Sequence, residues 1–262
     1  MDTNKKELLL NHIDTILTTL GRLDDTYGNP DLMFQTESEC LATLIDIDEQ
    51  CSDAFVQVAQ DLFQKIGEIE DAGYKFQLVL YVMMQRNHPD ALDMVIDAVE
   101  SDKIRDKGAM IDLLEDVNDR RLIHVMINVI QKDAQDIDKD DPDELGGEVR
   151  VKSINLLKQL QAHEASDFVE TCLDDPAYMV RESAVQFLVS MNHRSSANHF
   201  LKRIEIENYS SILIAMIAAL ARWEYKEVLP VLHSLLGKAK AEKNPRLKEA
   251  IRAAISKLER TS

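Results

Sequence analysis

The sequence is poor in glycine, proline and aromatic residues. Its 262 residues include 8 Gly and 6 Pro, and only 5% are aromatic. An all-β protein needs many turns, so this composition argues against one. The abundant Leu, Ile, Ala, Glu and Lys instead favour helices. Because 45% of the residues are hydrophobic, the chain can fill a substantial core, and we expect an all-α protein.

Paired cysteines and long apolar runs are also missing. Cys40, Cys51 and Cys172 are odd in number and have no CxxC spacing, which speaks against a disulfide framework. No run approaches the roughly 18 to 20 apolar residues that span a bilayer, and the N-terminus lacks a signal-peptide core. We therefore expect a cytoplasmic protein that does not bind membranes.

Positive charge is scarce. The chain has 30 Lys and Arg against 47 Asp and Glu, a formal charge of −17. Strong binding to nucleic acid or to an anionic membrane depends on clustered cations, so both are disfavoured as partners. From Leu201 onward, however, 12 Lys and Arg stand against 7 Asp and Glu. Because charge is unevenly distributed, the basic C-terminal end could bind an acidic partner, or the acidic remainder of the chain could bind a basic one.

Residues 175–204 have the pattern of two short helices that face each other. Asp175 suits a helix cap, and Pro176 suits the first helical turn. The apolar stripes contain Val180, Ala184, Phe187 and Leu188 in the first helix and Ala197, Phe200, Leu201 and Ile204 in the second. Because a pair this small cannot bury its own apolar face, similar pairs must stack on either side of it.

The same apolar pattern recurs about every 31 residues. First helices align at Val149, Val180, Ile212 and Leu247, in steps of 31, 32 and 35 residues. Second helices align independently, beginning at Leu92, Leu122, Ala165, Ala197 and Val228. Two templates with one period predict a stack of about six antiparallel helix pairs.

We expect this stack to be one continuous array with an irregular start. Residues 1–70 are predicted to form a helical cap over 4–26 and a degenerate first repeat, with helices over 38–49 and 53–69. Residues 71–262 are predicted to form the regular repeats. An acidic loop at 133–147 interrupts them, and insertions in repeat arrays often bind partners.

The stretch DDPAYMVRESAVQFLVSM resembles the HEAT-like repeats of phycobilisome-lyase subunits and many other bacterial proteins. It has their Asp-Pro turn followed by Val-Arg, Ala and Leu at helical spacing, here Asp175, Pro176, Val180, Arg181, Ala184 and Leu188. The resemblance implies a right-handed α-solenoid, with first helices on its convex side and second helices on its concave side. Members of this family are mostly interaction scaffolds, and some attach or detach bilin chromophores, so the resemblance leaves both functions open.

Cations follow the predicted starts of several first helices, at Lys75, Arg105, Arg150, Arg181 and Lys248. We expect them to pair with acidic turn residues such as Asp175 in a neighbouring repeat, and this interpretation is preferred to an anion site.

Three aspartates in the acidic loop, Asp136, Asp138 and Asp140, begin like a calcium loop. A calcium-binding EF-hand needs Gly at the sixth position and Glu at the twelfth, where this sequence has Asp141 and Gly147. A solvated acidic loop is therefore favoured over a calcium site.

The outward position of the second helices predicts a binding groove. His124, Asp167 and His199 occupy it in successive repeats, and helices about 10 Å apart place them along one groove without direct contact. The expected partner-binding residues are Met94, His124, Asn128, Asp167, Glu170, Thr171, His199, Lys202, Arg203 and His233. Their mixed charge suits a transient protein interface.

Catalytic and cofactor motifs are absent from the sequence. It has no HExxH, no Cys/His cluster with zinc spacing, no G-x-S-x-G, no P-loop and no dinucleotide-binding glycine pattern. We therefore predict no catalytic, cofactor-binding or metal-binding residues and no cofactor. The preferred hypothesis is a non-catalytic, protein-binding scaffold, and chromophore handling of the bilin-lyase type is the alternative.

Overall fold

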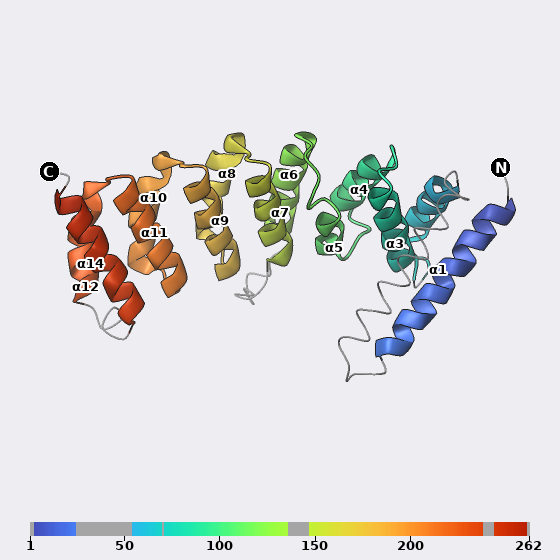
Figure 1. Cartoon of the computed structure of the whole chain (residues 1–262), viewed down its shortest axis with the longest axis horizontal. Helices are drawn as coiled ribbons and strands as arrows, with labels where there is room; N and C mark the ends of the chain where they lie inside the picture. The colour runs from blue at the N-terminus through green and yellow to red at the C-terminus, as the bar shows by residue number, and fades with distance from the viewer. Residues whose placement is uncertain (1–2, 25–53, 70, 136–146, 238–243, 261–262) are drawn as a thin grey trace. The chain divides into compact units, whose positions relative to one another are not determined.

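The computed structural model describes residues 3–24, 54–69, 71–135, 147–237 and 244–260, in which every regular element is a helix (Figure 1). The expectation of an all-α protein is confirmed for them. The predicted helix over 38–49, Cys40, Cys51 and the candidate calcium residues Asp136, Asp138 and Asp140 lie outside the described residues. The chain divides into two compact units, unit 1 (Met1–Val117) and unit 2 (Asn118–Ser262), and the predicted boundary at residue 70 stays a prediction.

Unit 1 begins with the long helix predicted over 4–26. Its elements are α1 (Thr3–Asp24), a helix over 54–65, α3 (Ala72–Gln85), α4 (Ala91–Glu100) and α5 (Lys107–Asp112). The predicted stripe residues Leu9, Ile13 and Ile16 are buried, and α1 packs against α3. Lys75 on α3 forms an ion pair with Asp14 on α1, with Nζ 2.5 Å from Oδ1. An amphipathic first helix is thus fixed to the unit by its apolar stripe and by charge.

Unit 2 consists of alternating first and second helices. The first helices are α7 (Glu148–Gln159), α9 (Tyr178–Ser190), α11 (Ser210–Arg222) and α14 (Pro245–Arg260), and the second helices are α6 (Arg121–Gln135), α8 (Ser166–Thr171), α10 (Ala197–Ile206) and α12 (Leu229–Leu236). Each first helix packs against the next, so that α7, α9 and α11 lie side by side in Figure 1. The second helices α6, α8 and α10 pack against α7, α9 and α11 respectively.

The predicted apolar stripes form the core of unit 2. Four residues on from the first-helix alignment position, Ser153, Ala184, Met216 and Ile251 are all buried. The second helices bury most of their template positions, including Leu122, Met126, Val129, Ala165, Val169, Ala197, Phe200, Val228 and Leu232. Phe168 and Leu201 are only half-buried. Burial thus follows the 31-residue pattern of the sequence.

A left-handed residue and a short 3₁₀ helix connect α7, α9 and α11 to the second helices that follow them. The left-handed residues are Gln161, Asn192 and Glu224, with φ of 50°, 52° and 59°. The 3₁₀ helices that follow are η1 (His163–Ala165), η3 (Arg194–Ser196) and η4 (Lys226–Val228). The sequence pattern did not predict this turn, because three different residue types fill the left-handed position.

The predicted loop at 133–147 is wrong at its start, because α6 extends to Gln135. Asp133 therefore lies in the last turn of α6, where it forms an ion pair with Arg150 on α7 that stabilises this placement. At the other end, Gly147 caps α7 with a left-handed φ of 88°. A Cβ added there would lie 2.6 Å from Cγ2 of Val180, so the close packing of α7 on α9 requires glycine at this position.

Candidate functional site

The predicted groove residues lie on the second helices, as the sequence pattern required. Met94 is on α4 in unit 1 and is half-buried. In unit 2, α6 carries His124 and Asn128, α8 carries Asp167, Glu170 and Thr171, α10 carries His199, Lys202 and Arg203, and α12 carries His233. Of these residues, Glu170 on α8 and His199 and Arg203 on α10 come together in a polar cluster between the two helices.

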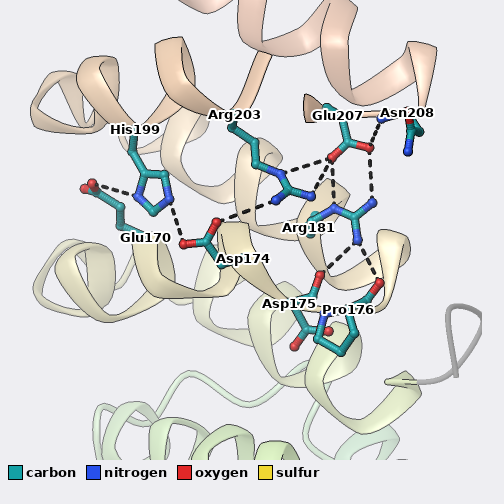
Figure 2. Close-up of polar contacts among 9 residues, drawn as sticks. All are labelled: Glu170, Asp174, Asp175, Pro176, Arg181, His199, Arg203, Glu207 and Asn208. Atoms are coloured by element: carbon teal, nitrogen blue, oxygen red, sulfur yellow. Dashed lines mark hydrogen bonds and ion pairs between the residues drawn. The ribbon is translucent and has the colours of Figure 1, made fainter. Parts of the chain in front are cut away.

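His199 on α10 connects two carboxylates of the preceding repeat (Figure 2). Its Nδ1 lies 3.3 Å from Oε1 of Glu170, and its Nε2 lies 3.1 Å from Oδ2 of Asp174. The doubly protonated ring is the form that donates to both carboxylates. Arg203, one turn further along α10, lies 3.6 Å from the second oxygen of Asp174. Two side chains of α10 therefore contact acidic residues at the end of the preceding second helix.

His193, in the turn before α10, adds to the same cluster. Its Nε2 lies 2.7 Å from Oγ of Ser195, 3.3 Å from Oδ1 of Asp167 and 3.5 Å from Oε2 of Glu170. A Ser-His-Asp triad uses one ring nitrogen for the serine and the other for the carboxylate. Because all three contacts are at Nε2, this group lacks the arrangement of a catalytic triad. Buried Ser196 donates to Glu170 at 2.7 Å and joins the turn to α8.

The cluster continues into a buried ion pair between Arg181 on α9 and Glu207 in the turn before α11 (Figure 2). Nε of Arg181 lies 2.9 Å from Oε2 and Nη2 lies 3.1 Å from Oε1, and Arg203 lies 3.4 Å from Oε2. The backbone N–H groups of Asn208 and Tyr209 donate to Oε1 at 2.7 and 3.0 Å. Burial alone raises the pKa of Glu207, but these donors outweigh it and lower the pKa from 4.5 to about 2.

Arg150 on α7 makes the corresponding contact one repeat earlier. Its Nε lies 2.9 Å from Oδ2 of Asp175, off the line of a hydrogen bond, while Nη2 donates to Oδ1 at 3.3 Å. The expected pairing of a first-helix cation with the acid of the next turn is confirmed here. Cys172 lies beside this pair, and its burial, together with the charge of Asp175, raises the pKa of the thiol to about 11.

An open cleft of about 380 Å³ lies beside the polar cluster of α8 and α10. Its lining residues are Glu170, Asp174, Asn198, His199, Lys202, Arg203 and Ile206. Lys202 is exposed on α10, and Ile206, one turn further on, keeps 64% of its surface exposed. The cleft thus offers charges of both signs next to one exposed apolar side chain.

The other predicted groove residues do not join this cleft. His124, Asn128 and Thr171 are exposed on α6 and α8, and the Oγ1 of Thr171 donates to the backbone oxygen of Phe168. His233 lies 3.6 Å from Glu259 on α14. Four of the ten predicted groove residues, Glu170, His199, Lys202 and Arg203, therefore line the cleft, and their role in binding stays a prediction.

Sequence reasoning missed His193, Asp174 and Glu207 as members of the cluster. A signal for Glu207 was present, since it follows Asp175 by one repeat of 32 residues and is likewise acidic. The prediction that Arg105 follows a helix start, as Arg150 and Arg181 do, is wrong. Arg150 and Arg181 lie inside their helices, whereas Arg105 precedes α5 and is exposed.

No group of three or more His, Cys, Asp or Glu side chains in the described ranges is arranged to hold a metal ion. Within those ranges, no helix is both long and apolar enough to cross a membrane. Comparison with protein-family models and with curated proteins finds no match. The resemblance to HEAT-like repeats therefore stays a prediction.

Proposed function

We propose that unit 2 binds a protein partner at the cleft between α8 and α10, as part of a cytoplasmic, non-catalytic scaffold with a right-handed α-solenoid fold. The observation that carries the proposal is this cleft, which gathers the predicted groove residues Glu170, His199, Lys202 and Arg203 at one opening. Protein interfaces combine an apolar centre with a polar rim. Ile206 supplies an apolar contact and Lys202 a charged one, one helical turn apart on the same face of α10.

The polar cluster behind the cleft supports this proposal. His199 and Arg203 are fixed by Glu170, Asp174 and Glu207, so α10 is held in place before any partner arrives. A preorganised surface loses less conformational entropy on binding, and more of the contact energy therefore appears as affinity. Chromophore handling of the bilin-lyase type remains the alternative, and it rests on the sequence resemblance alone.

Affinity capture with matched variants tests the proposal. The double variant Lys202→Glu/Ile206→Ser changes two exposed cleft residues that make no ion pair within the described part of the chain. Arg252→Glu makes the same charge reversal at an exposed position of α14 and serves as the control. We expect the wild type and Arg252→Glu to retain the same partner and the cleft variant to lose it, with helicity unchanged in all three. Equal capture by the cleft variant would place the interface elsewhere.

A further inference from the structure

Unit 1 contains a second, larger opening that the sequence did not predict. This pocket of about 560 Å³ is bounded by the turn at 66–69, by Gly73 and Tyr74 in the first turn of α3, by residues 103–106 and by Met110 of α5. Its volume falls within the range of small-molecule sites, roughly 300 to 1,000 Å³. It is formed entirely by residues of unit 1 and is independent of the cleft in unit 2.

Apolar side chains form part of the pocket wall. Ile104 and Met110 are buried, with 6% and 2% of their surface exposed. Ile69 and Tyr74, in contrast, keep 46% and 68% of their surface exposed although both are large. Exposed apolar side chains that line one concavity, instead of being scattered singly, mark a place where a ligand is bound.

Two cations lie at the wall of this pocket. Lys103 has its Nζ 5.4 Å from the ring centre of Phe63, a cation–π contact that keeps the ammonium group beside the pocket. Arg105 is exposed, and among the described residues no carboxylate lies within ion-pair distance of its guanidinium. Arg105 therefore has its hydrogen-bond donors available to a ligand.

This availability distinguishes Arg105 from the structural arginines of unit 2. Arg150 and Arg181 are buried, with 4% and 7% of their surface exposed. Each forms an ion pair with the acid of the next turn, Arg150 with Asp175 and Arg181 with Glu207. Arg105 makes no such contact and faces a cavity. The carboxylate of a ligand can therefore pair with Arg105 in the way that the turn acids pair with the arginines of unit 2.

The acidic residues of the pocket narrow the class of ligand. Oδ1 of Asp106 accepts from the backbone N–H of Ala109 at 2.9 Å, so this carboxylate is occupied at the start of α5. Together Asp106 and Glu68 balance the formal charges of Lys103 and Arg105. A polyanion such as nucleic acid finds no net positive field here, whereas one carboxylate on an apolar body matches both the guanidinium and the apolar walls.

We propose that this pocket binds a monocarboxylate with a compact aromatic or aliphatic body. Arg105 and Lys103 hold the carboxylate, and Tyr74, Ile69 and Met110 contact the body. Two kinds of ligand carry a carboxylate on such a body: a free carboxylic acid and the C-terminal residue of a peptide. In both, the carboxylate pairs with a planar guanidinium, the geometry that arginine recognises best.

Titration of the full-length, ¹⁵N-labelled chain with two pairs of probes tests the site. The first pair is 3-phenylpropanoate and its amide, and the second is a short peptide ending in Phe as the free acid and as the C-terminal amide. We expect at least one acid to bind with a Kd on the order of 1 mM, as suits so small a ligand. Its amide should bind roughly tenfold more weakly, since the charge-assisted hydrogen bonds are lost. The shifted resonances should include Gly73 and residues 103–106.

Variants separate this site from non-specific binding. Arg105→Gln should weaken acid binding about tenfold, and Arg252→Gln, an exposed arginine of unit 2, should not. A Cβ at Gly73 meets no atom within 4 Å, so Gly73→Leu should fill the pocket and abolish binding while the unfolding midpoint is maintained. Saturable binding of either acid, weakened about tenfold in Arg105→Gln, supports the proposal, and the acid that binds more tightly identifies the source. No saturable shift with any probe, equal binding of acid and amide, or binding unaffected by Arg105→Gln overturns it.

Discussion

Arg181 on α9 and Glu207 in the turn before α11 form a buried, two-point ion pair, with 2.9 Å between Nε and Oε2. Arg181 also donates to the backbone oxygens of Asp175 and Pro176 at 2.9 and 2.8 Å. One guanidinium thus joins the turns that precede two successive first helices. Through Arg203, Glu207 is linked in turn to the polar cluster behind the α8–α10 cleft.

Removing the charge of Glu207 should destabilise the chain strongly. Glu207→Gln leaves Arg181 buried without a counter-ion, and breaking such a pair costs about 3 to 5 kcal/mol of unfolding free energy. Glu205→Gln changes the same residue type at an exposed position nearby and should stay within about 0.5 kcal/mol of the wild type. Urea unfolding at pH 7, followed by far-UV circular dichroism, measures both differences.

The double variant Arg181→Met/Glu207→Leu separates the ion pair from its surroundings. An apolar pair of similar volume removes both buried charges, so most of the loss seen in Glu207→Gln should be recovered. A residual cost of about 1 to 3 kcal/mol is expected because the backbone oxygens of Asp175 and Pro176 lose their donor. The backbone N–H groups of Asn208 and Tyr209 also lose their acceptor. A double variant as unstable as the single one would contradict this assignment of the energy.

The pKa of Glu207 predicts a loss of stability in acid. Its folded pKa of about 2 lies below the unfolded value of 4.5, so its stabilisation is fully present above pH 4.5 and is lost as the pH falls towards 2. From pH 7 to pH 3 the wild type should therefore lose about 2 kcal/mol more than Glu207→Gln does. Parallel pH dependence of the unfolding free energy in the two proteins would show that Glu207 titrates normally.

Glycine should be required at position 147. Gly147→Ala places a methyl group 2.6 Å from Val180 and 2.7 Å from Nη2 of Arg150 at a φ of 88°. The left-handed backbone alone costs a non-glycine residue about 1 to 2 kcal/mol, and the close contacts add to it. The control is Gly73→Ala, where nothing lies within 4 Å and a better helix former should stabilise by up to about 1 kcal/mol. Thermal unfolding should show a lower midpoint for Gly147→Ala and a higher midpoint for Gly73→Ala than for the wild type.

The left-handed turns offer a stabilising substitution. Glu224 is exposed and has a φ of 59°, so Glu224→Gly should relieve strain and raise the unfolding free energy by about 0.5 to 1 kcal/mol. The matched substitution Asn192→Gly, at the same place one repeat earlier, should instead destabilise. Its Oδ1 accepts from Nε1 of Trp223 at 2.9 Å, and this hydrogen bond is lost. Destabilisation by Glu224→Gly would contradict the assignment to backbone strain, and stabilisation by Asn192→Gly would show that the hydrogen bond to Trp223 contributes little.

The sequence predicted the helical class and the buried stripes because apolar spacing determines which face of each helix is buried. Val180 and Ala184 lie in the core as the template requires. The pairing of first-helix cations with turn acids was also expected, and Arg150 with Asp175 is an instance of it. The left-handed turns were not predictable from the same pattern, since Gln161, Asn192 and Glu224 share a backbone conformation but no side-chain chemistry.

The candidate site was predicted only in part. Glu170, His199, Lys202 and Arg203 were identified because they face outward on second helices. His193 and Glu207 were missed because they lie in turns, where helical periodicity carries no information. The pocket in unit 1 depends on how the segments at 66–69 and 103–106 approach α3, a contact between non-adjacent segments that no local pattern records.

The most direct test of partner binding at the α8–α10 cleft is hydrogen–deuterium exchange of the full chain with and without the partner recovered by affinity capture. Burial of the cleft should slow exchange in Ala197–Ile206 and in residues 166–174, and the protection should disappear with Lys202→Glu/Ile206→Ser. Protection that spares both segments while the partner is bound would contradict the account.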